Sequence, residues 1–209
     1  MRKDIPHWEK AARVNGHTRF AYGHTRSYPP IEMRTSLTEL ADELDTTDRT
    51  LRRAVQQGLL HASRPSPRTL DLPIPERVYA RRAWPLLSSL REALRTEPTV
   101  SMAVLFGSRA RGDDHPLSDV DLLVRLRRGG DSHELAARLS ESVGHDVQAV
   151  MLDDARQKPL LLAEIVQEGR VLVDRDGAWS ALLAQRHRIE RAARREQRRI
   201  DDRFAAAFA

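Results

Sequence analysis

The chain has 209 residues, of which 40% are hydrophobic and 31% are charged, with a formal net charge of +5 and a pI of about 10.2. This length allows a substantial hydrophobic core and more than one small domain, and the basic charge favours polyanionic partners over a bare membrane. The absence of cysteine excludes disulfide bonds and thiolate metal sites, and no apolar run approaches the ~18 residues of a membrane span, so we expect a cytoplasmic protein.

Residues 1–34 contain histidine, aromatic and basic residues that follow no helical or strand period. We therefore expect an N-terminal extension that is poorly ordered or ordered by a partner. An arm that contacts nucleic acid is the alternative interpretation of the same composition. Pro29 and Pro30 close the segment, which places the first regular element after it.

Two short helices are predicted within residues 35–75. Ser36 and Glu39 have the spacing of a capping box, and leucines follow at helical spacing. The turn DTTD, residues 45–48, ends this helix and caps a second one, which ends at Gly58. Two capped helices, a tight turn and a proline-rich stretch suited to a hairpin resemble a winged helix-turn-helix domain. A plain helical hairpin packed against its neighbour is the alternative.

The second of these helices carries the candidate DNA contacts. In a helix-turn-helix domain this helix lies in the major groove, where arginine and threonine side chains reach phosphates and guanine edges. The residues predicted for this role are Arg49, Thr50, Arg52 and Arg53. Residues 76–96 are then predicted to form one or two linking helices, with Pro85 in the first turn of the second.

A glycine turn between two apolar runs carries the strongest chemical pattern in the sequence. Residues 100–106 are typical of a buried strand. Gly107 allows a tight turn after this strand, and Ser108 is expected to cap a short helix whose free backbone amides suit a phosphate group. On the next predicted strand, Asp119 and Asp121 alternate with apolar residues and therefore share one face.

Two carboxylates on one face of a strand repel each other unless a cation lies between them. Hard oxygen ligands beside a phosphate site favour Mg²⁺, which makes Asp119 and Asp121 the candidate metal ligands. The sequence therefore predicts a site for Mg²⁺ and a nucleoside triphosphate.

The compound motif Gly107-Ser108-Arg109-Ala110-Arg111-Gly112, followed by Ser118-Asp119-Val120-Asp121-Leu122, resembles the signature of minimal nucleotidyltransferases in the polymerase β-like superfamily. The resemblance covers residues 97–175. It implies an α+β fold in which helices flank a small mixed sheet, here preceded by the helix-turn-helix-like domain and followed by a long C-terminal helix. It also implies transfer of a nucleoside monophosphate from a Mg²⁺-bound triphosphate, with ATP expected, to an acceptor hydroxyl.

The resemblance assigns roles to the residues of this motif. Gly107 and Ser108 would hold the β- and γ-phosphates, and the two aspartates would hold one or two Mg²⁺ ions. Arg109 or Arg111 would neutralise phosphate, although Arg111 is equally suited to a structural ion pair.

The sequence departs from the family pattern at the third carboxylate, which the family carries on a later strand. Gln148 stands at this position, and a neutral amide is neither a base nor a good metal ligand. Asp146 lies two residues earlier, about 6.6 Å away along the strand, and is the candidate third catalytic residue. Both a working enzyme and one that binds nucleotide but transfers slowly are therefore expected alternatives.

Residues 178–209 are predicted to form a long amphipathic helix. Its apolar residues repeat at intervals of seven and four along one stripe, and arginines cover the other faces. The stripe needs a partner, either the core of the protein or a second chain, so a homo-oligomer formed through this helix is one expectation.

Two functions of different classes follow from these patterns, with a degenerate scaffold as a third. The first is a nucleotidyltransferase, which by the family resemblance would serve as the antitoxin of a partner toxin. The second is a DNA-binding transcriptional regulator with a weakened transferase domain. All but three of the 35 basic residues are arginines, which fits a nucleic-acid partner but also a GC-rich coding sequence.

Overall fold

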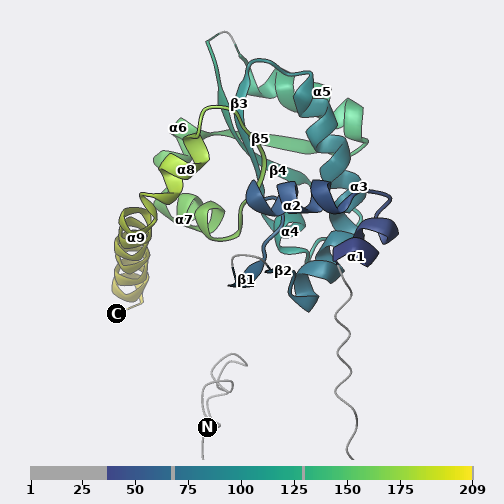
Figure 1. The fold of residues 1–209 in the computed structure, drawn as a ribbon. Helices are drawn as coiled ribbons and strands as arrows, with labels where there is room; N and C mark the ends of the chain where they lie inside the picture. The colour runs from purple at the N-terminus through teal and green to yellow at the C-terminus, as the bar shows by residue number, and fades with distance from the viewer. Residues whose placement is uncertain (1–36, 67–68, 129, 209) are drawn as a thin grey trace, which may run out of the picture. The chain divides into compact units, whose positions relative to one another are not determined.

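The computed structural model describes residues 37–66, 69–128 and 130–208 (Figure 1). The predicted extension, residues 1–34, and Ser36 of the predicted capping box lie outside the described residues. No helix in the described part of the chain is both long enough and apolar enough to cross a membrane.

The N-terminal elements are two helices and a two-stranded antiparallel sheet. They are α1 (Leu37–Glu43), α2 (Asp48–Gln56), β1 (Ser63–Ser66) and β2 (Thr69–Asp71). The Thr47 hydroxyl accepts a hydrogen bond from the Thr50 backbone N–H at 3.1 Å and caps α2, because a threonine oxygen at this position satisfies an amide that the helix leaves free. Helices, turn and hairpin therefore occur where the sequence predicts them, while their use in DNA binding stays a prediction.

A single long helix, α3 (Ile74–Arg95), takes the place of the one or two linking helices predicted for residues 76–96, as the first of these alternatives expects. Pro85 lies inside it rather than at the start of a second helix, and it removes one backbone hydrogen bond there. Leu87, Leu90 and Leu94 are fully buried, so packing of this face against the sheet holds the helix through the proline.

The sheet has four strands in the order β5-β4-β3-β6. β3 (Val100–Phe106) is antiparallel to β4 (Val120–Leu126) and to β6 (Arg170–Asp174), whereas β4 is parallel to β5 (Val147–Met151). The crossover between the two parallel strands contains α5 (Ser132–Val143). This mixed sheet with flanking helices confirms the predicted α+β fold class.

Helices cover both faces of the sheet, and β3 is therefore buried on both sides. Ala103 and Leu105 pack in the core with α1, α2, α3 and α5. Met102, Val104 and Phe106 pack in a second core on the other face. The helices after β5 that belong to this second layer are α6 (Leu152–Arg156), α7 (Pro159–Glu168), α8 (Ala178–Leu183) and α9 (Arg186–Ala207).

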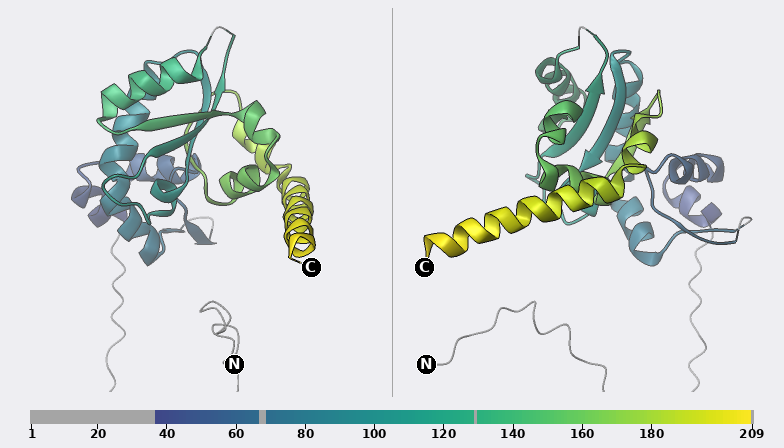
Figure 2. Two further views of the ribbon diagram at one scale, coloured as in Figure 1. Left: turned by 180° about the vertical axis from the view of Figure 1, so that it is seen from behind. Right: turned by 90° about the vertical axis from the view of Figure 1, so that its left-hand side faces the viewer.

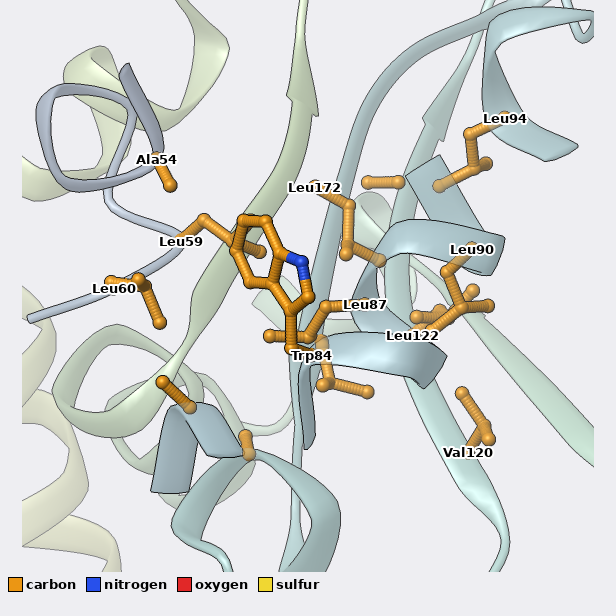
Figure 3. Close-up of a cluster of buried hydrophobic side chains, with 14 of the residues drawn as sticks. Ala54, Leu59, Leu60, Trp84, Leu87, Leu90, Leu94, Val120, Leu122 and Leu172 are labelled. Carbon is orange, nitrogen blue, oxygen red and sulfur yellow. The ribbon is translucent and has the colours of Figure 1, made fainter. Parts of the chain in front are cut away.

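The N-terminal helices share one continuous core with the sheet (Figure 3). Ala54, Leu59 and Leu60 belong to the same buried cluster as Trp84 of α3 and Leu172 of β6. The backbone N–H of Val171 also donates a hydrogen bond to the Gly58 carbonyl at 3.1 Å. The predicted boundaries near residues 75 and 97 therefore do not coincide with a break in the hydrophobic core.

The C-terminal segment is divided into two helices, α8 and α9, rather than one. Ile189 and Ala193 of the predicted stripe are buried, and Ile189 belongs to the same buried cluster as residues of α7. Further along, Phe204 and Phe208 are 64% and 87% exposed, and Figure 2 shows α9 extending away from the sheet. The core of the chain thus covers only the first part of the stripe, and oligomerisation through the rest stays a prediction.

Candidate active site

Gly107 forms the sharp turn between β3 and α4 (Ser108–Arg111) with φ 72° and ψ −159°. This backbone conformation is accessible to glycine and strained for other residues. The predicted Ser108 cap is wrong, because Ser108 is already the first helical residue and Gly107 occupies the capping position without a side-chain hydrogen bond. A Cβ atom on Gly107 would lie 2.5 Å from Oδ2 of Asp121, so the turn brings main chain and carboxylate into direct contact.

Gly107→Ala is therefore expected to lower the free energy of unfolding by about 1–3 kcal/mol and to displace Asp121. Gly144→Ala is the matched control, because Gly144 also has a positive φ of 69° but has nothing within 4 Å of an added Cβ. Denaturant titration and Mg²⁺-dependent nucleotide binding measure the two effects. Equal destabilisation of both variants, with nucleotide binding intact in Gly107→Ala, would contradict the close contact with Asp121.

Asp119 lies immediately before β4 and Asp121 lies within it. The two carboxylates are close enough for the charge of one to act on the other, as the sequence predicts. Burial raises the pKa of Asp121, and the negative charges of Asp119, Glu164 and Glu168 raise it further, while Arg111 opposes them. A half-buried carboxylate surrounded by like charges gains most when a cation neutralises the cluster.

The donor set at this position fits a divalent ion that retains part of its hydration shell. Among the described residues, no group of three or more acidic or histidine side chains has the arrangement of a metal site. Two carboxylates nevertheless suit Mg²⁺, which keeps several waters and usually takes its other ligands from the phosphates of a substrate. Asp119 and Asp121 would therefore hold the ion together with a bound triphosphate.

Gln148 lies beside this pair, at the position that the sequence predicts for the missing carboxylate. It is paired with Asp121 across β4 and β5, and its Nε2 donates a hydrogen bond to Oδ2 of Asp119 at 2.7 Å. Asp146 contributes its backbone carbonyl to the Val120 N–H at 2.8 Å. Its exposed carboxylate forms no hydrogen bond or ion pair with another described residue, so the structure joins Gln148, and not Asp146, to the acidic pair.

Arg109 supports the loop that carries Asp119 and does not contact the carboxylates of the acidic pair in any described interaction. Its side chain is 8% exposed, and its guanidinium donates to the carbonyls of Ser118 and Asp119 at 2.6–3.2 Å. It also lies 3.2 Å from Nδ1 of His145. These contacts hold the loop that delivers Asp119 to the start of β4. The structure thus gives Arg109 a positioning contact, and its phosphate contact stays a prediction.

Two acidic residues that the sequence interpretation missed engage the predicted phosphate-binding groups. Glu168 of α7 accepts a hydrogen bond from the Gly107 N–H at 2.9 Å and pairs with Arg111 at 3.0 Å. Glu164, one turn earlier, pairs with the same guanidinium at 3.0 Å. Arg111 therefore makes the structural ion pair that its sequence position allows. The two carboxylates four residues apart on a helix are the signal that could have revealed this pair.

A buried network supports α4 from the side of α3. Nε of Arg170 donates to the Ala110 carbonyl at 2.6 Å, and the Tyr79 hydroxyl donates to the Arg109 carbonyl at 3.1 Å. Arg170 also forms a two-pronged ion pair with Glu76 at 2.6 and 3.1 Å. The short helix after the glycine turn is thereby fixed to α3 and β6.

The candidate DNA contacts are divided between two faces of α2. Arg49 and Arg52 are exposed, and Arg52 pairs with Asp48 at 3.0 Å. Thr50 and Arg53 instead line a hollow that α3 and β6 also line. Neither set contacts the acidic pair in any described interaction.

Comparisons with known proteins agree with the fold. Residues 88–178 match the family described as Polymerase beta, Nucleotidyltransferase, and this range includes the whole sheet and the motif from Gly107 to Asp121. A comparison with curated proteins gave no significant match.

Several solved structures are similar over part of the chain. A toxin–antitoxin crystal structure with AMP-PNP is 24% identical, with a TM-score of 0.48, and the alignment covers 57% of this chain and 98% of that one. A complex of a tri-AMPylated HEPN toxin with an MNT antitoxin from Shewanella oneidensis is 21% identical, with a TM-score of 0.45 and coverage of 59% and 98%. The MntA–HepT toxin–antitoxin structure is 22% identical, with a TM-score of 0.43 and coverage of 57% and 96%. By the family match and its own topology, the segment from residue 88 to residue 178 is a domain similar to the polymerase β nucleotidyltransferases.

Proposed function

We propose that the chain transfers a nucleoside monophosphate from a Mg²⁺-bound nucleoside triphosphate to an acceptor hydroxyl. The observation that carries the proposal is the pairing of Asp119 and Asp121 beside the Gly107 turn. Glycine at this turn leaves room for a carboxylate, and the raised pKa of Asp121 supports a site at which a divalent cation would stabilise the fold.

In this transfer, one bond forms and one bond breaks at the α-phosphorus. The acceptor oxygen forms a bond to this phosphorus, the bond to the oxygen leading to the β-phosphorus breaks, and pyrophosphate leaves. When bound, Mg²⁺ would neutralise charge on the triphosphate. Asp119 and Asp121 would orient the triphosphate through the ion, and Gly107 and Ser108 would contact its outer phosphates. Asp146 would accept the hydroxyl proton only through a shift of β5 or an intervening water, because Gln148 and not Asp146 contacts the acidic pair.

Gln148 sets an upper limit on the rate in this proposal. Its amide fixes Oδ2 of Asp119 but accepts no proton. Gln148→Asp should therefore raise the transfer rate, by up to about 10²–10⁴-fold if the added carboxylate acts as a base or metal ligand. Gln148→Ala removes the hydrogen bond without adding a carboxylate and should be no faster than the native chain. Equal rates for the aspartate and alanine variants would exclude a limiting role of Gln148.

We further propose that ATP is the donor and that a hydroxyl of a partner toxin is the acceptor. The motif from Gly107 to Leu122 supports it through its resemblance to minimal nucleotidyltransferases. The descriptions of two similar structures, one with AMP-PNP and one with an AMPylated toxin, name the same chemistry for those proteins.

The position of a radioactive label in ATP tests the transfer directly. The chain is incubated with Mg²⁺, the protein encoded beside it, and ATP labelled either at the α- or at the γ-phosphate. The proposal expects acceptor label only from α-labelled ATP, and label in pyrophosphate from γ-labelled ATP. Acceptor label from the γ-phosphate would indicate a kinase, and no label from either would discard transfer to this acceptor.

A DNA-binding regulator is the second candidate, favoured by the exposed arginines of α2, which the β1–β2 hairpin follows along the chain. Binding to the DNA upstream of its own gene should weaken steeply with salt, because each phosphate contact releases counterions. Arg49→Gln and Arg52→Gln should both weaken it and reduce the salt dependence. Unchanged affinity in the double variant would remove the helix-turn-helix interpretation.

A further inference from the structure

A cavity of about 570 Å³ lies between α2, α3 and β6. None of the residues predicted to bind Mg²⁺ or the triphosphate lines it. Its volume lies within the range of small-molecule sites, about 300–1,000 Å³, and junctions between structural units are common positions for such sites. This junction is the one at which the N-terminal helices meet the sheet.

Two arginines from different helices bring positive charge to this cavity. Arg53 of α2 forms no ion pair with any described residue. Arg91 of α3 donates a hydrogen bond to Oε1 of Gln57 at 2.8 Å, which is a neutral partner. Burial lowers the pKa of Arg91, and the positive charge of Arg53 lowers it further. Two like charges in a partly desolvated space destabilise the fold, and an anion between them would remove this cost.

The remaining arginines of the cavity already have partners. Arg175 donates to the carbonyls of Leu94, Glu97 and Val100 at 2.6–2.8 Å and so caps the end of α3. Arg95 pairs with Glu92 on the same helix. The cavity is also lined by three acidic residues, none of which forms a described ion pair with Arg53 or Arg91, namely Asp45, Glu92 and Asp174.

Neutral donors and an aromatic surface complete the lining. Thr46, Thr50 and Ser88, which carry hydroxyl groups, line the cavity together with the two arginines. The indole of Trp84 forms part of its wall, and Figure 3 shows this ring among leucines from the 59–60 segment, α3 and β6. Hydroxyls beside guanidinium groups suit a tetrahedral oxyanion, because such an anion accepts several hydrogen bonds in different directions.

We propose that this cavity binds a small phosphorylated molecule through a phosphate group held between Arg53 and Arg91. The bound phosphate would connect α2 to α3 and so fix α2 against the sheet. The ligand would therefore act as an effector, because fixing α2 would change its affinity for any molecule that this helix binds. The proposal does not depend on transfer activity, since its residues are separate from the acidic pair.

Calorimetric titration of the full chain without Mg²⁺ tests the proposal. Inorganic phosphate and AMP are the two probes, and tighter binding of one identifies the source of the phosphate group. Arg53→Gln and Arg91→Gln should each weaken binding of the preferred probe about tenfold or more, the usual effect of removing a charged hydrogen-bond donor. Arg52→Gln, which removes an arginine on α2 outside the cavity, and Asp121→Asn, which alters the acidic pair, should leave binding unchanged.

Thermal unfolding gives a second readout that is independent of affinity. Without phosphate, Arg91→Gln should unfold at the same or a higher temperature than the native chain, because one of two repelling charges is removed. Arg53 is exposed, so Arg53→Gln tests the site even if Arg91→Gln does not fold. The proposal is overturned if neither probe binds the native chain or if Asp121→Asn abolishes binding. It is also overturned if Arg52→Gln weakens binding as much as Arg53→Gln, because equal effects would indicate a diffuse attraction of phosphate to the arginines of α2.

Discussion

Asp121→Asn should reduce nucleotidyl transfer by about 10²–10⁴-fold or more and, at neutral pH, stabilise the fold. The loss follows from the removal of one of the two carboxylates that would bind Mg²⁺, since an amide is a weak ligand for this ion. The gain follows from removing a charge that is destabilised first by burial and then by the like charges of Asp119, Glu164 and Glu168. Asp153→Asn is the control, because Asp153 is an exposed carboxylate on α6 whose ion-pair partner among the described residues is Arg156.

The pH dependence of stability separates these two effects. The pKa of Asp121 is higher in the folded chain than in the unfolded chain. Between the two values the folded chain binds more protons, so its free energy of unfolding falls as the pH rises through this window. In Asp121→Asn this part of the slope should disappear. Denaturant titrations at a series of pH values measure it, and an unchanged slope, or a variant less stable than the native chain at pH 7, would contradict the repulsion.

Arg170→Met should lower the free energy of unfolding by about 3–5 kcal/mol, the usual cost of leaving one member of a buried ion pair without its partner. Arg170 and Glu76 are 5% and 8% exposed. The guanidinium also donates to the Ala110 carbonyl and lies 3.5 Å from the centre of the Tyr79 ring. The variant therefore loses hydrogen bonds and a cation–π contact and leaves a buried carboxylate unpaired.

A second arginine–glutamate pair provides the control for this prediction. Arg138 forms a similar two-pronged pair with Glu97 at 2.8 and 3.0 Å, but its side chain is half exposed, so Arg138→Met should cost at most about 1 kcal/mol. The double variant Glu76→Leu with Arg170→Met should recover most of the loss, because no charge is then buried alone. Equal costs for Arg170→Met and Arg138→Met would show that the buried pair contributes no more than a surface pair.

The sheet and the turn that carries the acidic pair were predictable because their signals are local. A buried strand such as β3 is a continuous apolar run, and the alternation after Ser118 places both aspartates on one face. Gly107 is also a local signal, because the backbone conformation required at this turn is readily adopted only by glycine.

The contacts that hold this site were not predictable from local pattern. Arg170 and Glu76 lie 94 residues apart and meet only because β6 pairs with β3 beneath α3. Glu168 reaches the Gly107 amide across 61 residues. A charged residue on a helix has the same sequence pattern whether it faces solvent or a buried partner, so only the topology reveals which of the two it does.

The core that joins the first helices to the sheet determines where the chain can be shortened. The family match begins at residue 88, inside α3. It therefore excludes Leu59, Leu60 and Trp84, which belong to the hydrophobic core. A fragment cut at that point would expose the inner side of Leu172 and lose the carbonyl that receives the Val171 amide. The smallest independently folding piece should therefore begin near residue 36, and a segment defined by homology alone is expected to aggregate when it is produced in isolation.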